Sequence, residues 1–279
     1  MKKIIATGIT LLLLTACSNV PSNSSVEKEE VKQKKSTEEQ EKVETSEIND
    51  DELETTPEEK NETEEAVQTA EYVINENNWS IEPKSDANPK VVLLTIDDAP
   101  DKHALKMAED LKDLNAPAIF FVNGHFLNTP EEKEVLRKIH EMGFIIGNHT
   151  YSHTNLNDLS IEEQKEEIVS LNDLIESIIG ERPKFFRAPF GQNTEYSKQL
   201  VKEEKMALMN WTYGYDWVPE YQNKDSITDI MINSPFLNDG ANLLMHDRTW
   251  TSEGLVEIVK GIQGKGYEIL DPLRIETLE

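Results

Sequence analysis

The sequence predicts an α/β fold, a distorted (β/α) barrel of about seven strands that follows a disordered N-terminal tether. Beyond Asn88, short apolar runs alternate with amphipathic segments, which is the pattern of strands joined by crossover helices. The strand runs are apolar throughout, as in parallel strands that are buried on both faces. A doubly wound sheet would also fit this alternation. Polar residues follow several of the runs, however, and only a barrel gathers the C-terminal ends of all its strands around one opening.

The N-terminus is predicted to direct export and anchoring. Residues 1–3 are a short basic start, and Ile4 to Leu14 form an apolar run that is too short to cross a bilayer, which needs about twenty residues. The run ends in Leu-Thr-Ala-Cys, which resembles the lipobox of bacterial lipoproteins. We therefore expect residues 1–17 to be a signal peptide and Cys17 to carry lipid, so that the protein is extracytoplasmic and anchored to the cell membrane. The alternative is an ordinary signal peptide with an incidental cysteine.

Residues 18–84 are predicted to be a disordered acidic linker, and residues 85–279 the folded domain. The linker is rich in Glu, Lys, Ser, Thr and Asn and poor in aromatic residues, so it could not bury enough apolar surface to offset the entropy lost on ordering. Its last part, Glu71–Pro83, contains several large apolar residues. We weigh two interpretations of that part, a strap that packs on the barrel and a sticky linker.

Charge and cysteine content exclude two classes of function. The formal net charge is −26 at pH 7, and such a surface would repel the phosphates of nucleic acids, so no nucleic-acid partner is expected. Cys17 is the single cysteine, which excludes an internal disulfide and a cysteine-based zinc finger.

Strands and helices are predicted in alternation along the domain. The strands are expected at Val91–Asp97, Ala118–Asn123, Phe144–Asn148, Phe185–Arg187, Ala207–Tyr213, Asn242–His246 and Tyr267–Leu270. The helices, whose apolar residues recur every three or four positions, are expected at Ala104–Leu114, Glu131–Met142, Ile161–Ile179, Glu195–Glu204, Ile227–Ile232 and Gly254–Ile262.

The first strand ends in two adjacent carboxylates, Asp97 and Asp98. Two ionised carboxylates side by side repel each other, and a nearby cation is the common remedy. One of them could then bind a metal while the other acts as a base. Taken alone, the pair could equally be a turn or a helix cap.

After the third strand come His149 and His153, four residues apart, a spacing that could place both imidazoles on one side of a helical turn. Imidazole suits zinc, and a third ligand from a neighbouring strand end, with Asp98 as the candidate, would leave a coordination position open for water. In isolation, two surface histidines near a helix start would be an equally good interpretation.

Three further strand ends carry reactive or aromatic side chains: Arg187-Ala188-Pro189-Phe190-Gly191, Asp216-Trp217, and Leu244-Met245-His246. Separately, Arg187 could be an ion-pair partner, Trp217 a core residue and His246 a buried, hydrogen-bonded imidazole. Together they would reach the same opening of a barrel.

Taken in order, Thr-Ile-Asp-Asp-Ala-Pro, His-Thr-Tyr-Ser-His, Arg-Ala-Pro-Phe-Gly, Tyr-Asp-Trp and Leu-Met-His resemble the five motifs of the polysaccharide deacetylases, the NodB-homology domain or carbohydrate esterase family 4. The resemblance runs from about Pro89 to the C-terminus, and five ordered motifs are far more specific than one. It implies a distorted barrel that deacetylates polymers containing N-acetylglucosamine.

The resemblance also implies a role for each matching residue. The ligands of a divalent metal, expected to be Zn²⁺ with Co²⁺ or Ni²⁺ as alternatives, would be Asp98, His149 and His153. The catalytic residues would be the base Asp97, the arginine that steadies it, Arg187, the acid His246 and its orienting carboxylate, Asp216. The residues that shape the substrate-binding pocket would be Pro189, Phe190, Trp217 and Leu244.

The predicted function is therefore N-deacetylation of a cell-wall glycan, either peptidoglycan or a chitin-like or poly-N-acetylglucosamine chain. Acetate would be released by attack of a metal-bound water, with Asp97 as base and His246 as acid. The partners are the N-acetylated polymer and, through Cys17, the membrane. Two alternatives stay open: a non-catalytic glycan-binding lipoprotein on the same scaffold, and an esterase that removes O-acetyl groups from a polysaccharide.

Two positions depart from the family pattern. Ala99 stands where the family commonly has Gly, and Phe190 stands where it commonly has Tyr. Alanine is harmless if φ is negative there and costs about 1 kcal/mol or more if φ is positive. Phe190 lacks the phenolic hydroxyl but keeps its backbone N–H, so an oxyanion donor from the main chain would survive.

Overall fold

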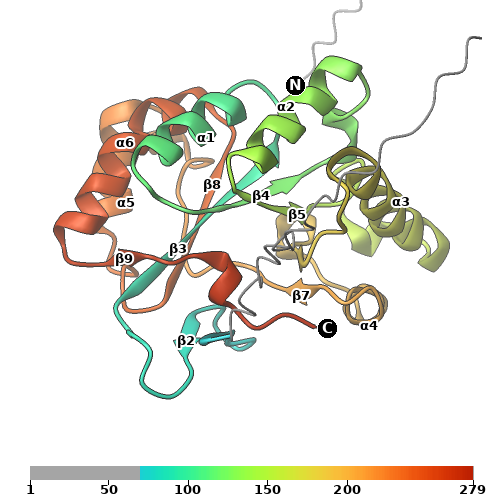
Figure 1. Cartoon of the computed structure of the whole chain (residues 1–279), viewed down its shortest axis with the longest axis horizontal. Coiled ribbons are helices and arrows are strands. Elements are labelled where there is room, and N and C mark those ends of the chain that lie inside the picture. Colours follow the sequence, from blue (N-terminus) through green and yellow to red (C-terminus); the bar gives the residue numbers. More distant parts are fainter. Residues whose placement is uncertain (1–69, 279) are drawn as a thin grey trace, which may run out of the picture. The chain divides into compact units, whose positions relative to one another are not determined.

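The computed structural model describes residues 70–278, and Figure 1 shows their arrangement. The predicted signal peptide, the lipidation site Cys17 and residues 18–69 of the predicted linker lie outside the described residues. Among the residues that are described, no helix combines the length and the apolar character that a membrane span requires.

The described part begins with a β-hairpin that belongs to the folded domain. Strands β1 (Tyr72–Ile74) and β2 (Ile81–Pro83) pair antiparallel, and the side chains of Tyr72 and Ile81 are buried. The C-terminal segment holds the hairpin, because the Glu276 N–H donates to the Tyr72 carbonyl at 2.8 Å. The linker boundary predicted at residue 84 therefore lies too far along the chain, and the strap interpretation of residues 71–83 is the correct one.

Seven parallel strands form the main sheet, in the order β7-β6-β5-β4-β3-β8, with β9 also paired to β3 (Figure 1). Their bounds are β3 (Val91–Ala99), β4 (Ile119–Val122), β5 (Ile145–Asn148), β6 (Phe185–Phe186), β7 (Ala207–Leu208), β8 (Ala241–His246) and β9 (Glu268–Ile269). Each predicted strand is present, and most differ from the prediction by only one or two residues at an end.

The segment from residue 207 to residue 213 connects the two ends of this curled sheet. Its start, β7, pairs with β6, whereas Tyr213 forms a parallel bridge with Leu243 of β8. Between them the ladder is interrupted at Asn210, whose carbonyl accepts hydrogen bonds from the side chains of Arg187 at 2.8 Å and Asn242 at 2.9 Å. The prediction of a distorted barrel is thus confirmed, and the doubly wound alternative is excluded.

Six α-helices cover the sheet: α1 (Ala104–Asp113), α2 (Pro130–Glu141), α3 (Ile161–Ile179), α4 (Glu195–Glu203), α5 (Lys224–Asn233) and α6 (Thr249–Gly264). Capping boxes at Thr129, Ser160 and Thr194 start α2, α3 and α4, so the side chain of each cap satisfies a free N–H of the first turn. Helix α6 begins five residues before its predicted start, because its first turn buries the polar residues Thr251 and Ser252, which apolar spacing does not detect.

Strand β3 separates two parts of the hydrophobic core. Val92, Leu94 and Ile96 pack with the helices, whereas Val91 and Leu93 point to a second cluster, which also contains the hairpin residues Tyr72 and Ile81. This alternation explains why the strand is apolar at every position. The hairpin therefore closes the end of the barrel where the strands begin, and the opposite end stays accessible.

We predict that Tyr72→Ala lowers the free energy of unfolding by about 3–5 kcal/mol, because it removes a large, fully buried aromatic side chain. Urea unfolding followed by circular dichroism measures this change. Glu76→Ala, at an exposed position of the same hairpin, is the control and should change stability by less than about 0.5 kcal/mol. Equal stabilities of the two variants would show that the hairpin does not belong to the cooperative fold.

Candidate metal centre and active site

A pocket of about 430 Å³ lies at the C-terminal ends of the strands. Ten residues line it: Asp97, Asp98, His149, His153, Phe190, Trp211, Trp217, Leu244, His246 and Arg248. Strand β3 supplies the two aspartates, β8 supplies Leu244 and His246, and loops after β5, β6 and β7 supply most of the others. Each of the five sequence motifs thus contributes at least one residue to the pocket. Four motifs do so at or just after the end of a different strand, and the fifth does so from the loop after β7.

Asp98, His149 and His153 each direct one potential ligand atom into a common space, and these atoms lie within 4.8 Å of one another. Oδ1 of Asp98 lies 3.3 Å from Nε2 of His153 and 3.9 Å from Nε2 of His149. Two ligand atoms on one zinc ion, each bonded at about 2.0–2.2 Å with tetrahedral geometry, are separated by roughly 3.3 Å. The same Oδ1 atom is buried without a hydrogen-bond partner. Spacing, chemistry and this unpaired oxygen all fit a divalent cation.

The environment of His149 holds the ring in the form that a metal requires. Nδ1 donates a hydrogen bond to the Arg187 carbonyl at 2.7 Å, which leaves the lone pair of Nε2 directed toward Asp98. Burial, reinforced by the neighbouring His153, lowers the pKa of His149 to about 3. Its imidazole is therefore neutral at physiological pH and available as a ligand.

The backbone adopts strained conformations around this cluster. Asp98, Thr150 and His153 have φ values of 57°, 68° and 60°, in the left-handed region that non-glycine residues avoid. Asn148 holds one of these turns, because its side-chain oxygen accepts a hydrogen bond from the Thr150 N–H at 2.8 Å. The residue with positive φ in the first motif is Asp98 rather than Ala99, so alanine fits without strain where the family commonly has glycine.

Asp97 is buried beside the cluster and is held by Arg187. One guanidinium nitrogen of Arg187, Nη1, donates to Oδ1 of Asp97 and to Oγ1 of Thr95, at 2.7 Å in both cases. The other carboxylate oxygen, Oδ2, lies 3.5 Å from Nε2 of His149. Burial raises the pKa of Asp97 above its ordinary value, and the charge of Arg187 opposes that rise.

His246 lines the same pocket and is held by Asp216. Its Nδ1 lies 2.7 Å from Oδ1 of Asp216, whose Oδ2 accepts hydrogen bonds from the His246 N–H at 2.6 Å and from the Thr251 hydroxyl at 2.8 Å. Burial opposes protonation of His246, but the charge of Asp216 and its hydrogen bond outweigh this, so the pKa of His246 is raised. In the β3–β8 register, His246 pairs directly with Asp97.

Aromatic side chains form the walls of the pocket. Phe190 is 60 % exposed and Trp217 is 46 % exposed, although both rings are large and apolar. Phe190 packs against His153 with 4.9 Å between ring centroids, and Trp217 packs against His246 at 5.6 Å. Of the predicted substrate residues, Leu244 also lines the pocket, whereas Pro189 is buried and does not.

The backbone N–H of Phe190 faces no acceptor among the described residues. The turn around it is closed instead by the Gly191 and Gln192 N–H groups, which donate to the carbonyls of Ala188 and Pro189 at 3.0 Å. Phe190 itself has φ of 58°, which turns its peptide group away from the regular pattern. This N–H is free to bind an oxygen atom of a ligand.

Sequence reasoning missed two residues of the pocket, Trp211 and Arg248. Trp211 lies inside the segment predicted to be a regular strand, and it packs against Trp217 with 6.2 Å between centroids. Arg248 donates from Nη2 to Oδ2 of Asp98 at 2.8 Å. Its position two residues after His246 could have indicated that it lies near the pocket, because β8 ends at His246.

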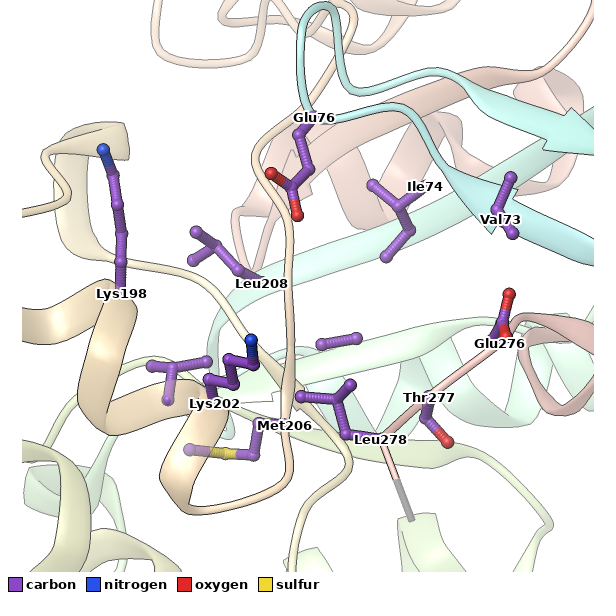
Figure 2. A pocket seen from close by; sticks show the side chains of 12 residues that line it. Val73, Ile74, Glu76, Lys198, Lys202, Met206, Leu208, Glu276, Thr277 and Leu278 are labelled. Carbon is purple, nitrogen blue, oxygen red and sulfur yellow. The ribbon is translucent and has the colours of Figure 1, made fainter.

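A second pocket, of about 440 Å³, lies between β1, the C-terminal residues, α4 and β7 (Figure 2). Its lining is mainly apolar, with the charged side chains of Glu76, Lys198, Lys202 and Glu276. No histidine or aspartate lines it, and among the described residues the cluster of carboxylate and imidazole groups that could hold a metal lies in the first pocket. Size alone does not identify the functional site in this protein.

The pocket of this parallel barrel contains a cluster of two histidines and one carboxylate. Beside the cluster lie an aspartate held by an arginine and a histidine held by an aspartate. Together these groups define a hydrolase-type centre. Comparison with known proteins gives the family. Residues 84–209 match the family model described as polysaccharide deacetylase. The structure superposes on that of the peptidoglycan deacetylase PdaC from Bacillus subtilis with a TM-score of 0.60 and 30% identity, covering 67% of this chain and 90% of that one. The chain belongs to the polysaccharide deacetylases, carbohydrate esterase family 4.

Curated relatives agree with this assignment. The chain is 32% identical over 197 residues to the peptidoglycan-N-acetylmuramic acid deacetylase PdaC of Bacillus subtilis, which covers 70% of this chain and 40% of PdaC. It is 31% identical over 161 residues to a peptidoglycan-N-acetylglucosamine deacetylase of Bacillus cereus, which covers 57% of this chain and 56% of that protein. The matches thus span about half of the length of these relatives.

The family also contains members without activity. A carbohydrate esterase family 4 pseudoenzyme from Bacillus anthracis superposes with a TM-score of 0.59 and 27% identity, covering 65% of this chain and 63% of that one. Family membership therefore does not by itself establish catalysis, which depends on the residues present in the pocket.

We predict that Zn²⁺ stabilises the protein and that His153→Ala removes most of this effect, because one of three ligands is lost. A ligand at 100 times its Kd stabilises a folded protein by about 2.7 kcal/mol, which a thermal-shift measurement resolves. His125→Ala is the control, since His125 is exposed and does not line the pocket. Equal stabilisation of His153→Ala and the unchanged protein would contradict the assignment of the ligands.

Proposed function

We propose that this protein is a metal-dependent hydrolase that removes N-acetyl groups from a cell-wall glycan, with peptidoglycan as the polymer that its relatives favour. One observation carries the proposal: Asp98, His149 and His153 converge in one pocket with Asp97 and His246. The names of the relatives support the choice of polymer, since they are peptidoglycan deacetylases. They include enzymes for both N-acetylmuramic acid and N-acetylglucosamine, and the proposal covers both sugars.

A divalent cation, with Zn²⁺ as the favoured ion, would be held by Asp98, His149 and His153, and when bound it would lower the pKa of water and polarise an acetyl carbonyl. Asp97 is placed to take a proton from the attacking water. Its Oδ1 is occupied by Arg187 and its Oδ2 is not, so one carboxylate oxygen is available to accept the proton. A carboxyl group whose burial raises its pKa is a stronger base than one in water.

His246 is placed to give a proton to the departing sugar amine. Asp216 fixes the ring through Nδ1 and raises its pKa, which favours the protonated form that carries a proton on the opposite nitrogen, Nε2. Cleavage of the amide bond then yields acetate and a free amino sugar. Asp97 and His246 are register partners on β3 and β8, which places the base and the acid on adjacent strands.

The free N–H of Phe190 is placed to bind the oxyanion that develops on the acetyl carbonyl. Donors of this kind contribute about 3 kcal/mol to catalysis when they are well aligned. This role needs only the backbone, so the phenylalanine side chain does not remove it. The exposed rings of Phe190 and Trp217 would contact the apolar faces of the sugar units.

We also propose that the protein works outside the cytoplasm, anchored to the membrane through a lipid on Cys17, with the acidic segment before residue 70 as a tether. The support is the sequence pattern of the first seventeen residues and the composition of the segment that follows. An anchored enzyme with a long tether would reach an insoluble polymer close to the membrane.

A second candidate, a glycan-binding protein without activity, is favoured by the similarity to a pseudoenzyme. The complete set of base, acid and metal-ligand candidates in the pocket argues against it. Removal of O-acetyl groups is a further alternative, because the same groups would attack an ester carbonyl. Incubation with N-acetylated and O-acetylated polymers in parallel separates the two hydrolase activities.

Acetate release from N-acetylglucosamine oligomers and from peptidoglycan strands tests the proposed function. Asp97→Asn should lower kcat by about 10²-fold or more, because the amide cannot accept the proton. A chelator should abolish activity, and added Zn²⁺ or Co²⁺ should restore it.

The matched control is Asp101→Asn, an exposed aspartate in the loop that follows, which should keep full activity. The Asp97→Asn protein should still be stabilised by Zn²⁺, which shows that the site is intact. Undiminished acetate release by Asp97→Asn would refute the proposed base. Sugar binding by the zinc-loaded protein without any acetate release would favour the non-catalytic candidate.

A further inference from the structure

Asp98 is held by an arginine of its own. Nη2 of Arg248 donates to Oδ2 of Asp98 at 2.8 Å, whereas Oδ1 of Asp98 faces His149 and His153 and has no hydrogen-bond partner. The two oxygens of one carboxylate are therefore assigned to different tasks. The side chain of Asp98 is 14% exposed and that of Arg248 is 39% exposed, so the arginine lies on the solvent side of the carboxylate.

The fold brings Arg248 to this place through the end of β8. Asp97 pairs with His246 in the sheet, and the Asp247 N–H donates to the Asp97 carbonyl at 3.1 Å, so the residues that follow lie next to Asp98. Nη1 of Arg248 also donates to the Asp247 carbonyl at 3.3 Å, which directs the guanidinium group back toward β3.

Asp247 fixes the other side of the same loop. Its carboxylate accepts the backbone N–H groups of four consecutive residues, 101 to 104, at 2.7–3.1 Å. These residues follow Asp98 after Ala99 and Pro100 and lead into α1, whose first residue is Ala104. The end of β8 thus holds the β3–α1 loop through the main chain, by Asp247, and through the carboxylate of Asp98, by Arg248.

Arg248 occupies a position that helix stability alone does not favour. It is the N-cap of α6, its side chain makes no capping hydrogen bond, and the first turn of α6 contains no acidic residue. Ser, Thr, Asp and Asn are preferred at this position, and a cation is unfavourable at the positive end of the helix dipole. The contacts that its guanidinium group does make are with the Asp98 carboxylate and the Asp247 carbonyl.

The neighbouring aspartate has a parallel arrangement. Arg187 binds Oδ1 of Asp97 and leaves Oδ2 facing the centre of the pocket. Each of the two adjacent carboxylates is therefore held by one arginine through one oxygen. This also reduces the repulsion between the two negative charges before any cation is bound.

We propose that Arg248 is a positioning residue that holds Asp98 by Oδ2, so that Asp98 offers a metal ion a single, pre-oriented oxygen. The inference rests on the proposed metal-dependent function. A carboxylate that is free on both sides can rotate away from the histidines or bind an ion through both oxygens. With Oδ2 held by Arg248, the ion keeps open positions for water and for the acetyl oxygen.

Zinc affinity of the full chain, measured by competition with a chromogenic chelator, tests this role. Arg248→Met keeps the aliphatic part of the side chain and removes the donor, and it should weaken zinc binding by about 10- to 100-fold, as is typical when a group that orients a ligand is lost. Arg248→Lys, which keeps a donor and a charge, should restore part of the affinity. Arg137→Met, in the exposed pair with Glu134 on α2, should bind zinc like the unchanged protein.

The gain in melting temperature on addition of Zn²⁺ separates this role from a purely structural one. Arg248→Met should gain less on addition of Zn²⁺ than the unchanged protein, whichever way its metal-free melting temperature moves. Unchanged or tighter zinc binding by Arg248→Met would overturn the inference. An Arg248→Met protein that melts at a lower temperature without metal but gains as much on addition of Zn²⁺ as the unchanged protein would also overturn it, because the arginine would then act on the fold alone.

Asp98→Asn distinguishes failure of this inference from failure of the proposed function. Weak zinc binding by Asp98→Asn together with normal binding by Arg248→Met would overturn the role of Arg248 and leave the metal site in place. Equal zinc binding by Asp98→Asn and the unchanged protein would remove the metal site itself, and the role of Arg248 with it.

Discussion

Two carboxylates on consecutive residues, Asp97 and Asp98, share a pocket in which both side chains are largely buried, and the rest of the site is arranged around their repulsion. Asp97 and Asp98 stand at the end of a buried strand, where ionised groups are costly unless cations or hydrogen bonds compensate them. Arg187 compensates the charge of Asp97, and Arg248 compensates the charge of Asp98. A cation bound between Asp98 and the two histidines would compensate it further. This division leaves each carboxylate with one oxygen directed into the pocket, which is the condition for separate tasks.

The parallel register of β3 and β8 brings further groups of the site next to these two carboxylates. It places His246 beside Asp97 and brings Asp247 and Arg248 next to Asp98 and the loop that follows it. The barrel is closed at its opposite end by the hairpin, so the positions of these strands are fixed from below while their C-terminal ends stay open. The strained backbone at Asp98 is held from both sides, by the sheet and by the bonds to Asp247.

The sequence predicts much of this because its signals are local. Apolar runs locate the strands, and the order of the motifs predicts which side chains meet at the opening, where the structure does place Asp97, Asp98, His149, His153 and His246 together. What the sequence misses depends on contacts between distant segments. The hairpin residues looked like linker because their burial requires the C-terminal segment, and the polar first turn of α6 gives no apolar period. Trp211 could not be assigned, since only the irregular course after β7 directs it into the pocket, and Arg248 was missed although it closely follows His246.

The proposed function depends on a single metal ion that binds between Asp98 and the two histidines. Anomalous diffraction from crystals soaked with Zn²⁺ tests this most directly, because the signal at the zinc absorption edge locates the metal independently of the protein atoms. We predict one anomalous-difference peak, about 2.0–2.2 Å from Oδ1 of Asp98 and from Nε2 of His149 and His153, with Asp97 outside bonding distance. A peak elsewhere, or none at this site in fully soaked crystals, would contradict it.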